Sequence, residues 1–360
     1  MTQLTVLGIE TSCDETAAAV VRLSVGEQSV PPTGEILSNI VFSQIEEHKR
    51  FGGVVPEIAA RSHVTRLDGL IEEAVREAGI DLEGLDGIAA TAGPGLIGGV
   101  MVGLVTGKAL ALAGQKPFVA VNHLEAHLLT IRLTSPAPDM AFPYLLLLVS
   151  GGHCQLVNVR GLGDYEVYGT TLDDAAGEAF DKAAKLLGLG YPGGPEIEIC
   201  ARTGDPSAID LPRPLQHDGS CNFSFSGLKT ALRTCARAME PVSQNEIADL
   251  AASFQAAITD CLAERCTNAM ARFAADHPQA DKKLVVAGGV AANCVIRARL
   301  SDTARNQGFS LACAPAALCT DNAAMIAWTG AERLLAGQHD GLDTAPQARW
   351  PLEDVTVPGA

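Results

Sequence analysis

The chain carries the same pattern twice, in which two apolar segments flank a short turn of small and polar residues. The first copy occupies residues 4–23 around a polar turn at 10–16, and the second occupies residues 143–159 around Ser-Gly-Gly-His at 150–153. Short apolar runs bounded by turn residues predict buried strands. A strand–turn–strand at the head of each half predicts a duplicated α/β fold with a cleft between the halves.

A β-α-β unit is predicted between the two copies. Residues 85–90 and 117–121 have the composition of strands, and an apolar helix to about residue 113 follows the glycine-rich turn 91–99. This turn does not match Gly-x-Gly-x-x-Gly and lacks the Gly-Lys-Ser/Thr of a P-loop. A later strand at 283–286 runs into Gly288-Gly289 and a helix, which is a natural place for a nucleotide or its phosphate.

The domain boundaries follow from this pattern. Residues 134–143 contain three prolines and are expected to be a linker. The expected first domain comprises residues 1–135 with about 320–345 added, and the second comprises residues 140–319. The tail at 340–360 is polar and contains proline, so it is expected to be loosely ordered.

His123 and His127 are four residues apart, which places both imidazoles on one face of a helix, one turn apart. Two imidazoles at this spacing can share one divalent metal, but a pair of surface or core histidines explains them equally well. Asp321, near the start of the last predicted helix, is the third ligand of the hypothesis. As an N-cap alone it would have a purely structural explanation.

The zincin motif places the general base directly after the first histidine, as His-Glu-x-x-His. Here the glutamate is Glu125, two residues after His123, which is a rotation of roughly 200° on a helix. Glu125 is therefore expected to point away from the metal face, and a peptidase mechanism is disfavoured.

Composition excludes some classes of function. Aromatic residues make up 4% of the chain and the formal net charge is −16, which argue against a stacking platform and a broad electrostatic footprint for nucleic acid. A nucleic-acid substrate would need a local patch or a partner. The ten cysteines include no Cys-x-x-Cys pair and are expected to be free thiols in a reducing compartment. Lys108 and several glycines interrupt the apolar stretch 98–114, and the N-terminus lacks a basic region, so no membrane span or signal peptide is predicted.

Several polar segments are candidates for binding or catalysis. The turn at 10–16 holds hydroxyl and acidic groups, among them Asp14 and Glu15, at the end of a core strand. Residues 191–198 contain four glycines or prolines in succession and are expected to be a stiff loop that forms a binding wall. The strongest basic stripe of the acidic chain is expected on a helix that carries Lys229, Arg233 and Arg237, whereas His48 and His63 are assigned structural roles.

Ten spaced motifs between about residues 4 and 335 closely resemble those of the TsaD family, long called O-sialoglycoprotein endopeptidase or Gcp. They include Gly-Ile-Glu-Thr-Ser-Cys-Asp-Glu-Thr at 8–16, Gly-Gly-Val-Val-Pro-Glu at 52–57, Asn-His-Leu-Glu-Ala-His at 122–127, Val-Ser-Gly-Gly-His at 149–153 and Cys-Thr-Asp-Asn-Ala-Ala-Met at 319–325. The bacterial form is the more similar one, because no kinase domain follows. The resemblance implies an actin-like ATPase (ASKHA) fold of two duplicated α/β domains around a central cleft.

The resemblance also implies an activity, the transfer of a threonylcarbamoyl group from threonylcarbamoyl-AMP to N6 of adenosine 37 in tRNAs that read codons beginning with A. It implies that His123, His127 and Asp321 bind one divalent metal per subunit, Fe²⁺ first and Zn²⁺ as the alternative. The residues that it implies for the adenylate are Leu148, Val149, Ser150, Gly151, Gly152, Asp181, Gly194, Glu198 and Asn293. Members of the family often have Asp where Glu198 stands, and the longer side chain could still reach a ribose hydroxyl.

The expected chemistry is attack of a weak amine on the carbonyl carbon of a mixed anhydride. A metal can act there as a Lewis acid, and Asp14 or Glu15 could take the proton from the attacking nitrogen. The expected partners are tRNA and accessory subunits of the TsaB and TsaE type, with no membrane and no DNA, in the cytoplasm.

Three rival functions differ in what they require. A metallopeptidase needs a general base beside the metal, which the spacing of Glu125 does not supply. A sugar or carboxylate kinase of the actin-like fold needs no His-x-x-x-His. A non-catalytic scaffold like the shorter paralogue of the family would lack both the histidines and the segment 288–293, which are present here.

Overall fold

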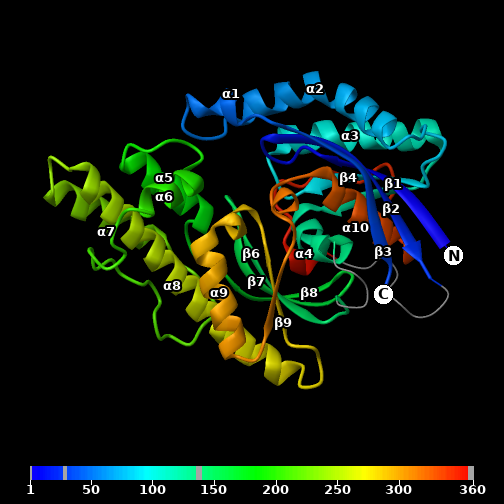
Figure 1. Ribbon diagram of the computed structural model, residues 1–360. Helices are drawn as coiled ribbons and strands as arrows, with labels where there is room; N and C mark the ends of the chain where they lie inside the picture. The colour runs from blue at the N-terminus through cyan, green and yellow to red at the C-terminus, as the bar shows by residue number, and fades with distance from the viewer. Residues whose placement is uncertain (1, 27–30, 135–139, 356–360) are drawn as a thin grey trace. The chain divides into compact units, whose positions relative to one another are not determined.

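The computed structural model describes residues 2–26, 31–134 and 140–355, so that most of the expected linker and the last five residues lie outside the described part. The chain divides into two compact units. Unit 1 comprises residues 1–142, 159–166 and 320–360, and unit 2 comprises residues 143–158 and 167–319. The chain forms two five-stranded sheets, each with helices packed on it (Figure 1). The first sheet lies in unit 1, and the second lies in unit 2 apart from its residues within 159–166, which belong to unit 1.

The two sheets have the same connectivity. The strand order is β3-β2-β1-β4-β5 in the first sheet and, written in the same direction, β8-β7-β6-β9-β10 in the second. In each sheet the third, second, first, fourth and fifth strands of that half therefore lie in this order. The first strand is parallel to the fourth in both, β1 with β4 and β6 with β9. This identity of topology is what the repeated strand–turn–strand predicted.

The first sheet is built from strands of unit 1, and the α-helices of this unit surround it. The strands are β1 (Thr2–Glu10), β2 (Glu15–Val25), β3 (Thr33–Ser43), β4 (Gly87–Gly93) and β5 (Phe118–Asn122). The helices are α1 (Ile45–Lys49), α2 (Pro56–Glu77), α3 (Ile97–Gly114), α4 (His123–Thr134) and α10 (Ala323–Leu335). A short 3₁₀ turn, η3 (Leu352–Asp354), lies near the end of the chain.

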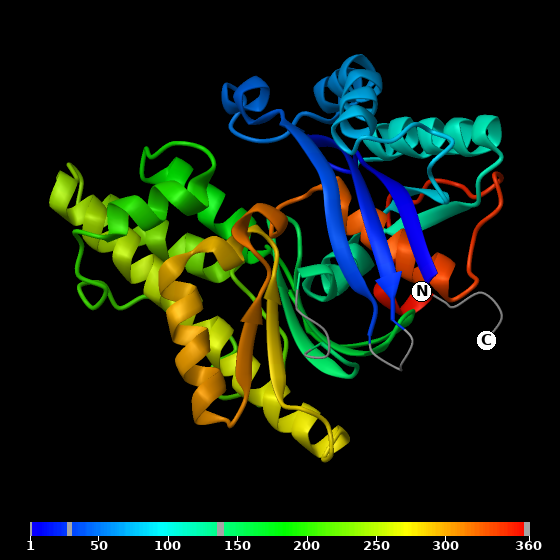
Figure 2. The same cartoon turned by 45° about the vertical axis from the view of Figure 1, so that its right-hand side comes forward.

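Alternate residues of β1 face different helices, as the period of two in a strand requires. Leu7 and Ile9 belong to the apolar core beneath α2 and α3. Gly8 faces α10, where an added Cβ would come within 2.5 Å of the backbone nitrogen of Ala327. Helices α2 and α3 thus cover one face of the first sheet, and α4 and α10 cover the other (Figures 1 and 2).

Helix α3 packs against the first sheet through glycines spaced four residues apart. A Cβ added at Gly99 or Gly103 would collide with Thr11, and one added at Gly107 would lie 2.9 Å from Ala90 Cβ. Within the described residues, α3 is also the one helix long and apolar enough to cross a membrane, with 33% of that 18-residue window buried. Its glycine face lies on the sheet, as in a core helix of a globular unit.

The second sheet consists of β6 (Tyr144–Val149), β7 (Cys154–Gly161), β8 (Asp164–Thr170), β9 (Lys283–Ala287) and β10 (Ser310–Cys313). The α-helices of unit 2 are α5 (Ala176–Leu186), α6 (Gly193–Ala201), α7 (Ser226–Ala238), α8 (Gln244–Asp276) and α9 (Cys294–Asn306). Two 3₁₀ turns, η1 (Gly289–Ala292) and η2 (Ala316–Leu318), follow β9 and β10. Helix α8 is largely buried, and its Ser243–Glu246 capping box satisfies the first turn.

Two local predictions are wrong. The segment expected to be a stiff loop at 191–198 becomes helix α6 from Gly193 onward, because Pro192 precedes the first turn and leaves the following residues free to become helical. The tail expected to be loosely ordered is instead held by unit 1 up to residue 355. The amide of Gln347 donates to Ala92 at 2.7 Å, Asn122 donates to the carbonyl of Trp350 at 3.0 Å, and Leu352 is buried.

The close approach of α3 to the sheet makes a stability prediction. Gly103→Ala is expected to lower the free energy of unfolding by about 1–3 kcal/mol, because the added methyl overlaps the Thr11 side chain. Gly69→Ala is the matched control, since Gly69 also lies within a helix but has no atom within 4 Å of an added Cβ. It is expected to raise stability by up to about 1 kcal/mol. Denaturant unfolding of both variants measures this, and equal stabilities would contradict the packing described for α3.

Candidate functional site

Helix α4 begins directly at the end of strand β5, and the residue before it fixes its first turn. Asn122 is the last residue of β5, and its side-chain oxygen accepts hydrogen bonds from the amides of Leu124 at 2.9 Å and Glu125 at 3.2 Å. An Asn side chain that accepts from the free amides of a first turn acts as a helix cap. The sheet therefore determines where the two histidines of α4 point.

The structure brings His123, His127 and Asp321 together. One ligand atom from each residue lies within 4.8 Å of the others. The Nε2 atoms of His123 and His127 are 3.5 and 3.1 Å from Asp321 Oδ1. Both histidines are almost completely buried, with 6% and 2% of their surfaces exposed. Two imidazole nitrogens thus converge on one carboxylate oxygen in a space shielded from solvent.

Asp321 is not the cap of the last helix. Asn322 takes that role, because its side-chain oxygen accepts a hydrogen bond from the amide of Met325 at 3.1 Å at the start of α10. The purely structural explanation of Asp321 therefore does not apply. Its carboxylate is free of the helix end and faces the two histidines.

A buried carboxylate contacts the Nδ1 side of the His123 ring, opposite the Nε2 side that faces Asp321. Glu10 Oε2 lies 2.9 Å from His123 Nδ1 and accepts a second hydrogen bond from Thr91 Oγ1 at 2.7 Å. The other carboxylate oxygen of Glu10 accepts from the amide of Ser12 at 2.5 Å. A histidine that donates its Nδ1 proton to a carboxylate presents the lone pair of Nε2 on its opposite side. This arrangement aims the His123 Nε2 lone pair at the space next to Asp321.

The charges in this cluster depend on one another. Burial opposes ionisation of Asp321, yet the neighbouring His123 holds the pKa of the Asp321 carboxyl well below its usual range. Burial likewise opposes ionisation of Glu10, and His123 again lowers the pKa of that carboxyl. Burial alone would lower the pKa of His123, but Asp321 and Glu10 raise it well above its ordinary value. The two carboxylates thus form an anionic pocket that favours a cation.

Glu125 points away from this cluster, as the helix geometry predicts. It is fully buried, its carboxylate accepts two hydrogen bonds from Arg333 of α10 at 2.7 and 3.0 Å, and it accepts a third from the Tyr165 hydroxyl at 2.7 Å. A carboxylate held by three donors on the far side of α4 cannot serve as a general base at the histidine pair.

Asp14 and Glu15 lie in the turn that follows β1, within unit 1. Asp14 is nearly buried, and its carbonyl accepts a hydrogen bond from the amide of Gln44 at 3.0 Å. Burial, together with the negative charges of Asp321 and Asp14, raises the pKa of the Glu15 carboxyl to about 9. The hydroxyl of Ser12 in the same turn lies 3.2 Å from His123 Nδ1, so the turn and the histidine cluster belong to the same region of unit 1.

In unit 2, the residues expected to bind the adenylate gather at the carboxyl ends of β6 and β9. Leu148 pairs with Ala287 in the parallel ladder, so Val149 and Ser150 emerge beside Gly288. Gly288 has φ +92°, and a Cβ there would lie 2.6 Å from the carbonyl carbon of Val149. The other expected loop residues, Gly151 and Gly152, have open space around an added Cβ.

The remaining expected adenylate residues each have an intramolecular partner in unit 2. Asp181 accepts a hydrogen bond from the amide of Gly193 at 2.6 Å, next to Gly194 at the start of α6. Glu198 of α6 accepts from the amide of Cys294 at 3.0 Å. Asn293 caps α9 by accepting from the amide of Ile296 at 3.0 Å and donates to Gln255 at 2.9 Å. These contacts join α5, α6 and the start of α9 into one group.

Of the three basic residues expected to form a stripe on α7, one is paired with a carboxylate and two are exposed. Lys229 lies 3.5 Å from Asp174, and Asp174 also pairs with Lys182 at 2.7 Å. Arg233 and Arg237 are exposed. Asp173 accepts hydrogen bonds from Ser224 and from the first amides of the same helix, which lowers the pKa of its carboxyl despite some burial.

The residues of the histidine cluster fit a bound metal. Two imidazole nitrogens and one carboxylate oxygen are the donors that divalent first-row transition metals prefer, and a two-histidine, one-carboxylate set with open positions suits Fe²⁺ as well as Zn²⁺. The carboxylate behind His123 is the usual outer partner of a metal-binding histidine. The molecule is thus a duplicated α/β protein with a buried site suited to one divalent metal.

Comparison with known sequences identifies the family. A family model described as TsaD, tRNA N6-adenosine threonylcarbamoyltransferase, matches residues 35–328. The chain is 58% identical over 355 residues to the tRNA N6-adenosine threonylcarbamoyltransferases of Brucella suis and Brucella abortus, covering 98% of this chain and 96% of each relative. The chain belongs to the TsaD family. The family assignment that the sequence motifs predicted is confirmed.

Comparison with solved structures supports the fold class. HypF from T. kodakarensis is similar with a TM-score of 0.58 and 13% identity over 98% of this chain, which spans 49% of that protein. A full-length HypF in a phosphate- and nucleotide-bound form gives a TM-score of 0.55 at 12% identity, over 93% of this chain and 47% of that one. The predicted actin-like ATPase (ASKHA) fold with two duplicated α/β halves is confirmed.

The sequence-based prediction missed the residues that support the histidines. Glu10 and Thr91 are both buried and far apart in sequence, and they meet because β1 and β4 are adjacent in the sheet. One signal was present, since Glu10 is an acidic residue at the end of an otherwise apolar strand. Arg333 and Tyr165, which bind Glu125, show no comparable signal in the sequence.

The contact between Glu10 and His123 predicts a metal-affinity effect. Glu10→Gln keeps the shape of the side chain but removes the charge that fixes the His123 tautomer, so Zn²⁺ or Fe²⁺ affinity is expected to fall about 10- to 100-fold. Titration with a competing chelator measures the affinity. Asp340→Asn is the matched control, because Asp340 is a half-buried carboxylate of unit 1 that accepts a hydrogen bond from the amide of Ala120 at 2.8 Å and touches none of the three proposed ligands. If both variants lose affinity equally, the effect reflects general destabilisation and the role given to Glu10 is wrong.

Proposed function

We propose that the chain transfers the threonylcarbamoyl group of threonylcarbamoyl-AMP to N6 of adenosine 37 in tRNAs that read codons beginning with A. The observation that carries the proposal is the buried cluster of His123, His127 and Asp321 in a chain of the TsaD family. The relatives that match almost the whole chain are named for this transfer to tRNA.

His123, His127 and Asp321 are proposed to hold one divalent metal, with Fe²⁺ as the first candidate and Zn²⁺ as the alternative. When bound, the metal supplies a Lewis acid for the carbonyl or phosphate of the donor. Burial of the three ligands and the carboxylate behind His123 support this assignment, since they keep water away and fix the ring.

The adenylate is assigned to residues of unit 2. The proposed binding residues are Leu148, Val149, Ser150, Gly151, Gly152, Asp181, Gly194, Glu198 and Asn293. Open backbone at Gly151 and Gly152 and the helix start at Asn293 support binding of a phosphate there. The amide of Cys294 donates a hydrogen bond to the carboxylate of Glu198, so this side chain reaches the start of α9. Its proposed contact is with a ribose hydroxyl.

Asp14 or Glu15 is proposed to receive the proton that the attacking amine loses. Asp14 lies in the turn between β1 and β2, and Glu15 is the first residue of β2. The same turn carries Ser12, whose hydroxyl lies 3.2 Å from His123 Nδ1, so both carboxyls belong to the region of the histidine cluster, where a carboxylate can act as a general base. The two carboxyls are adjacent in the chain, so the role is assigned to the pair until variants separate them.

The proposed partners are tRNA and accessory subunits of the TsaB and TsaE type, without a membrane or DNA, and the proposed location is the cytoplasm where tRNA is modified. A net charge of −16 supports the need for accessory subunits, because the chain as a whole repels a polyanion. The two units are proposed to be the two duplicated domains, near residues 1–135 with about 320–345 and 140–319, with matching strand orders as support.

The rival functions lack support in the geometry. A metallopeptidase needs a base at the metal, and Glu125 is bound to Arg333 and Tyr165 on the opposite side of α4. A kinase of the same fold gives no role to two buried histidines that face a carboxylate.

The transfer itself can be measured with labelled threonine and bicarbonate on unmodified tRNA, with the donor synthase and accessory subunits added. Wild type is expected to label tRNA, and His123→Ala and Asp321→Asn are each expected to lose label by at least about 100-fold, because each removes a ligand atom. Val105→Ala, on the exposed face of α3, is the control and is expected to keep the label. Full labelling by both ligand variants would refute the metal assignment.

The proposed base predicts a difference between two neighbouring carboxyls. Glu15→Gln is expected to lower the transfer rate at saturating tRNA by about 10²- to 10⁴-fold if Glu15 accepts the proton, while metal content stays at the wild-type level. Asp14→Asn, measured in parallel, identifies the alternative. Wild-type rates in both variants would remove the turn from the proton transfer.

A further inference from the structure

We propose that residues 49–53, here called the basic loop, contact the RNA substrate together with Arg61. An unpaired base stacks on Phe51, and phosphates pair with Lys49, Arg50 and Arg61. This inference rests on the proposed transfer to tRNA and assigns a surface to the substrate.

The basic loop presents an aromatic side chain to solvent. Phe51 is 47% exposed and is the one aromatic residue among the exposed large hydrophobic side chains of the described chain. The guanidinium of Arg50 lies over its ring at 4.7 Å from the centroid. An exposed ring with an arginine stacked on it is the kind of platform that holds an unpaired RNA base.

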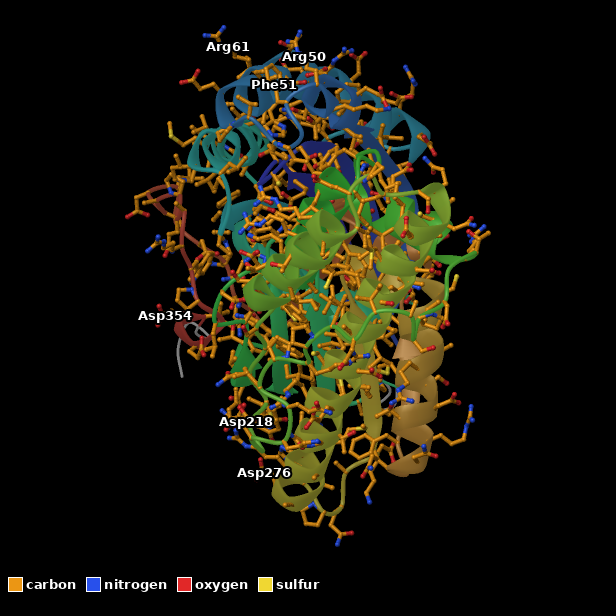
Figure 3. The ribbon with its side chains drawn as sticks, turned by 90° about the vertical axis from the view of Figure 1, so that its left-hand side faces the viewer. Arg50, Phe51, Arg61, Asp218, Asp276 and Asp354 are labelled. Atoms are coloured by element: carbon orange, nitrogen blue, oxygen red, sulfur yellow. The ribbon has the colours of Figure 1, made fainter. Side chains whose placement is uncertain are left out.

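Free positive charge surrounds Phe51. In the described part of the chain, Arg50 and Arg61 have no carboxylate within ion-pair distance. Two other exposed arginines, Arg76 and Arg305, each pair with an acid. Lys49 pairs with Glu46 at 3.4 Å, but both side chains are more than half exposed, so the pair is weak and exchangeable. Figure 3 shows Arg50, Phe51 and Arg61 pointing outward at the α1–α2 end of unit 1.

A second arginine–aromatic pair lies between α2 and the end of β3. The guanidinium of Arg66 lies 4.5 Å from the centroid of the Phe42 ring. The next residue, Ser43, donates a hydrogen bond to Glu15 at 3.4 Å. The end of β3, which leads through α1 to the basic loop, therefore lies beside one of the carboxyls proposed to take the proton from the attacking amine.

Buried polar groups hold the basic loop in one conformation. His48 is fully buried, contacts Gln44 at 3.2 Å, and accepts a hydrogen bond from the amide of Val55 at 3.3 Å. The amide of Phe51 donates to the carbonyl of His48 at 2.8 Å. Gly52 closes the turn with φ +69°, a conformation that glycine adopts without strain. A loop fixed before binding loses little entropy when RNA binds.

The same groups tie the basic loop to the turn of Asp14 and Glu15. The amide of Gln44 donates to the carbonyl of Asp14 at 3.0 Å. His63 of α2 lies 3.1 Å from the carbonyl of Cys13 and 2.8 Å from the hydroxyl of Thr16. A base stacked on Phe51 would therefore be held at a fixed distance from the carboxyls of that turn, which is what recognition of a nucleotide near the reacting adenosine requires.

The test measures binding of unmodified tRNA by the full chain at several salt concentrations. Phe51→Ala is expected to weaken binding about tenfold with an unchanged salt dependence, and Phe51→Trp is expected to restore it, because stacking needs only an aromatic ring. Arg50→Ala with Arg61→Ala is expected to lower the slope of log K against log salt by about 1 to 2 units. Arg76→Ala is the matched control, because Arg76 is an exposed but paired arginine on α2, about four turns from Arg61. This variant is expected to bind tRNA as the wild type does.

Kinetics with the accessory subunits separate this inference from the proposed function. If wild type transfers the group and the loop variants raise KM for tRNA while kcat and metal content stay constant, the inference is supported. If wild type transfers and the loop variants keep the wild-type KM, the inference is wrong and the proposed function stands. If the variants keep tRNA binding but fail to assemble with the accessory subunits, the basic loop is a protein-docking surface and the RNA assignment falls. If wild type neither binds nor modifies tRNA, the proposed function itself has failed.

Discussion

The site of unit 1 depends on one buried contact, the one between Glu10 and His123. Glu10 is the last residue of β1, Thr91 belongs to the neighbouring β4, and His123 is the first residue of α4. A buried carboxylate without partners would be strongly destabilising, and here an imidazole, a hydroxyl and a backbone amide satisfy it. Because these donors come from three separate elements, satisfying one carboxylate also fixes the direction of the ring that faces Asp321.

A second buried carboxylate fixes the opposite side of the same helix. Glu125 binds Arg333, and Arg132, about two turns further along α4, binds Glu332. Two ion pairs therefore join α4 to α10. Removing one partner of such a pair typically costs about 3–5 kcal/mol, because the other charge stays buried. Since α10 follows Asp321 directly, these pairs hold the third proposed ligand in register with the two histidines. The glutamate that suggests a peptidase therefore has an architectural role.

The sequence predicted the periodic and repeated features well. The duplicated sheets, the histidine helix and the direction of Glu125 all follow from periods of two and 3.6 residues, which depend only on local geometry. It failed where a helix starts after a proline, as at Gly193, and where tertiary contacts order a polar segment, as at Gln347. It also missed Thr91 as a partner of Glu10, since strand adjacency is not encoded within either strand. Contacts between distant segments were therefore the part that local patterns could not supply.

An acidic protein can act on RNA if its positive charge is concentrated where the RNA lies. At physiological salt, charges more than about 8–10 Å apart are largely screened, so most of the −16 net charge has little effect on a phosphate beside Arg50. What matters locally is whether the guanidinium already has a carboxylate partner. Many arginines of this chain do, through contacts such as Arg213 with Asp260 and Arg160 with Asp164. Arg50 and Arg61 have no such partner among the described residues, and they lie near the exposed ring of Phe51. The net charge thus limits nonspecific RNA binding without opposing binding at this one surface.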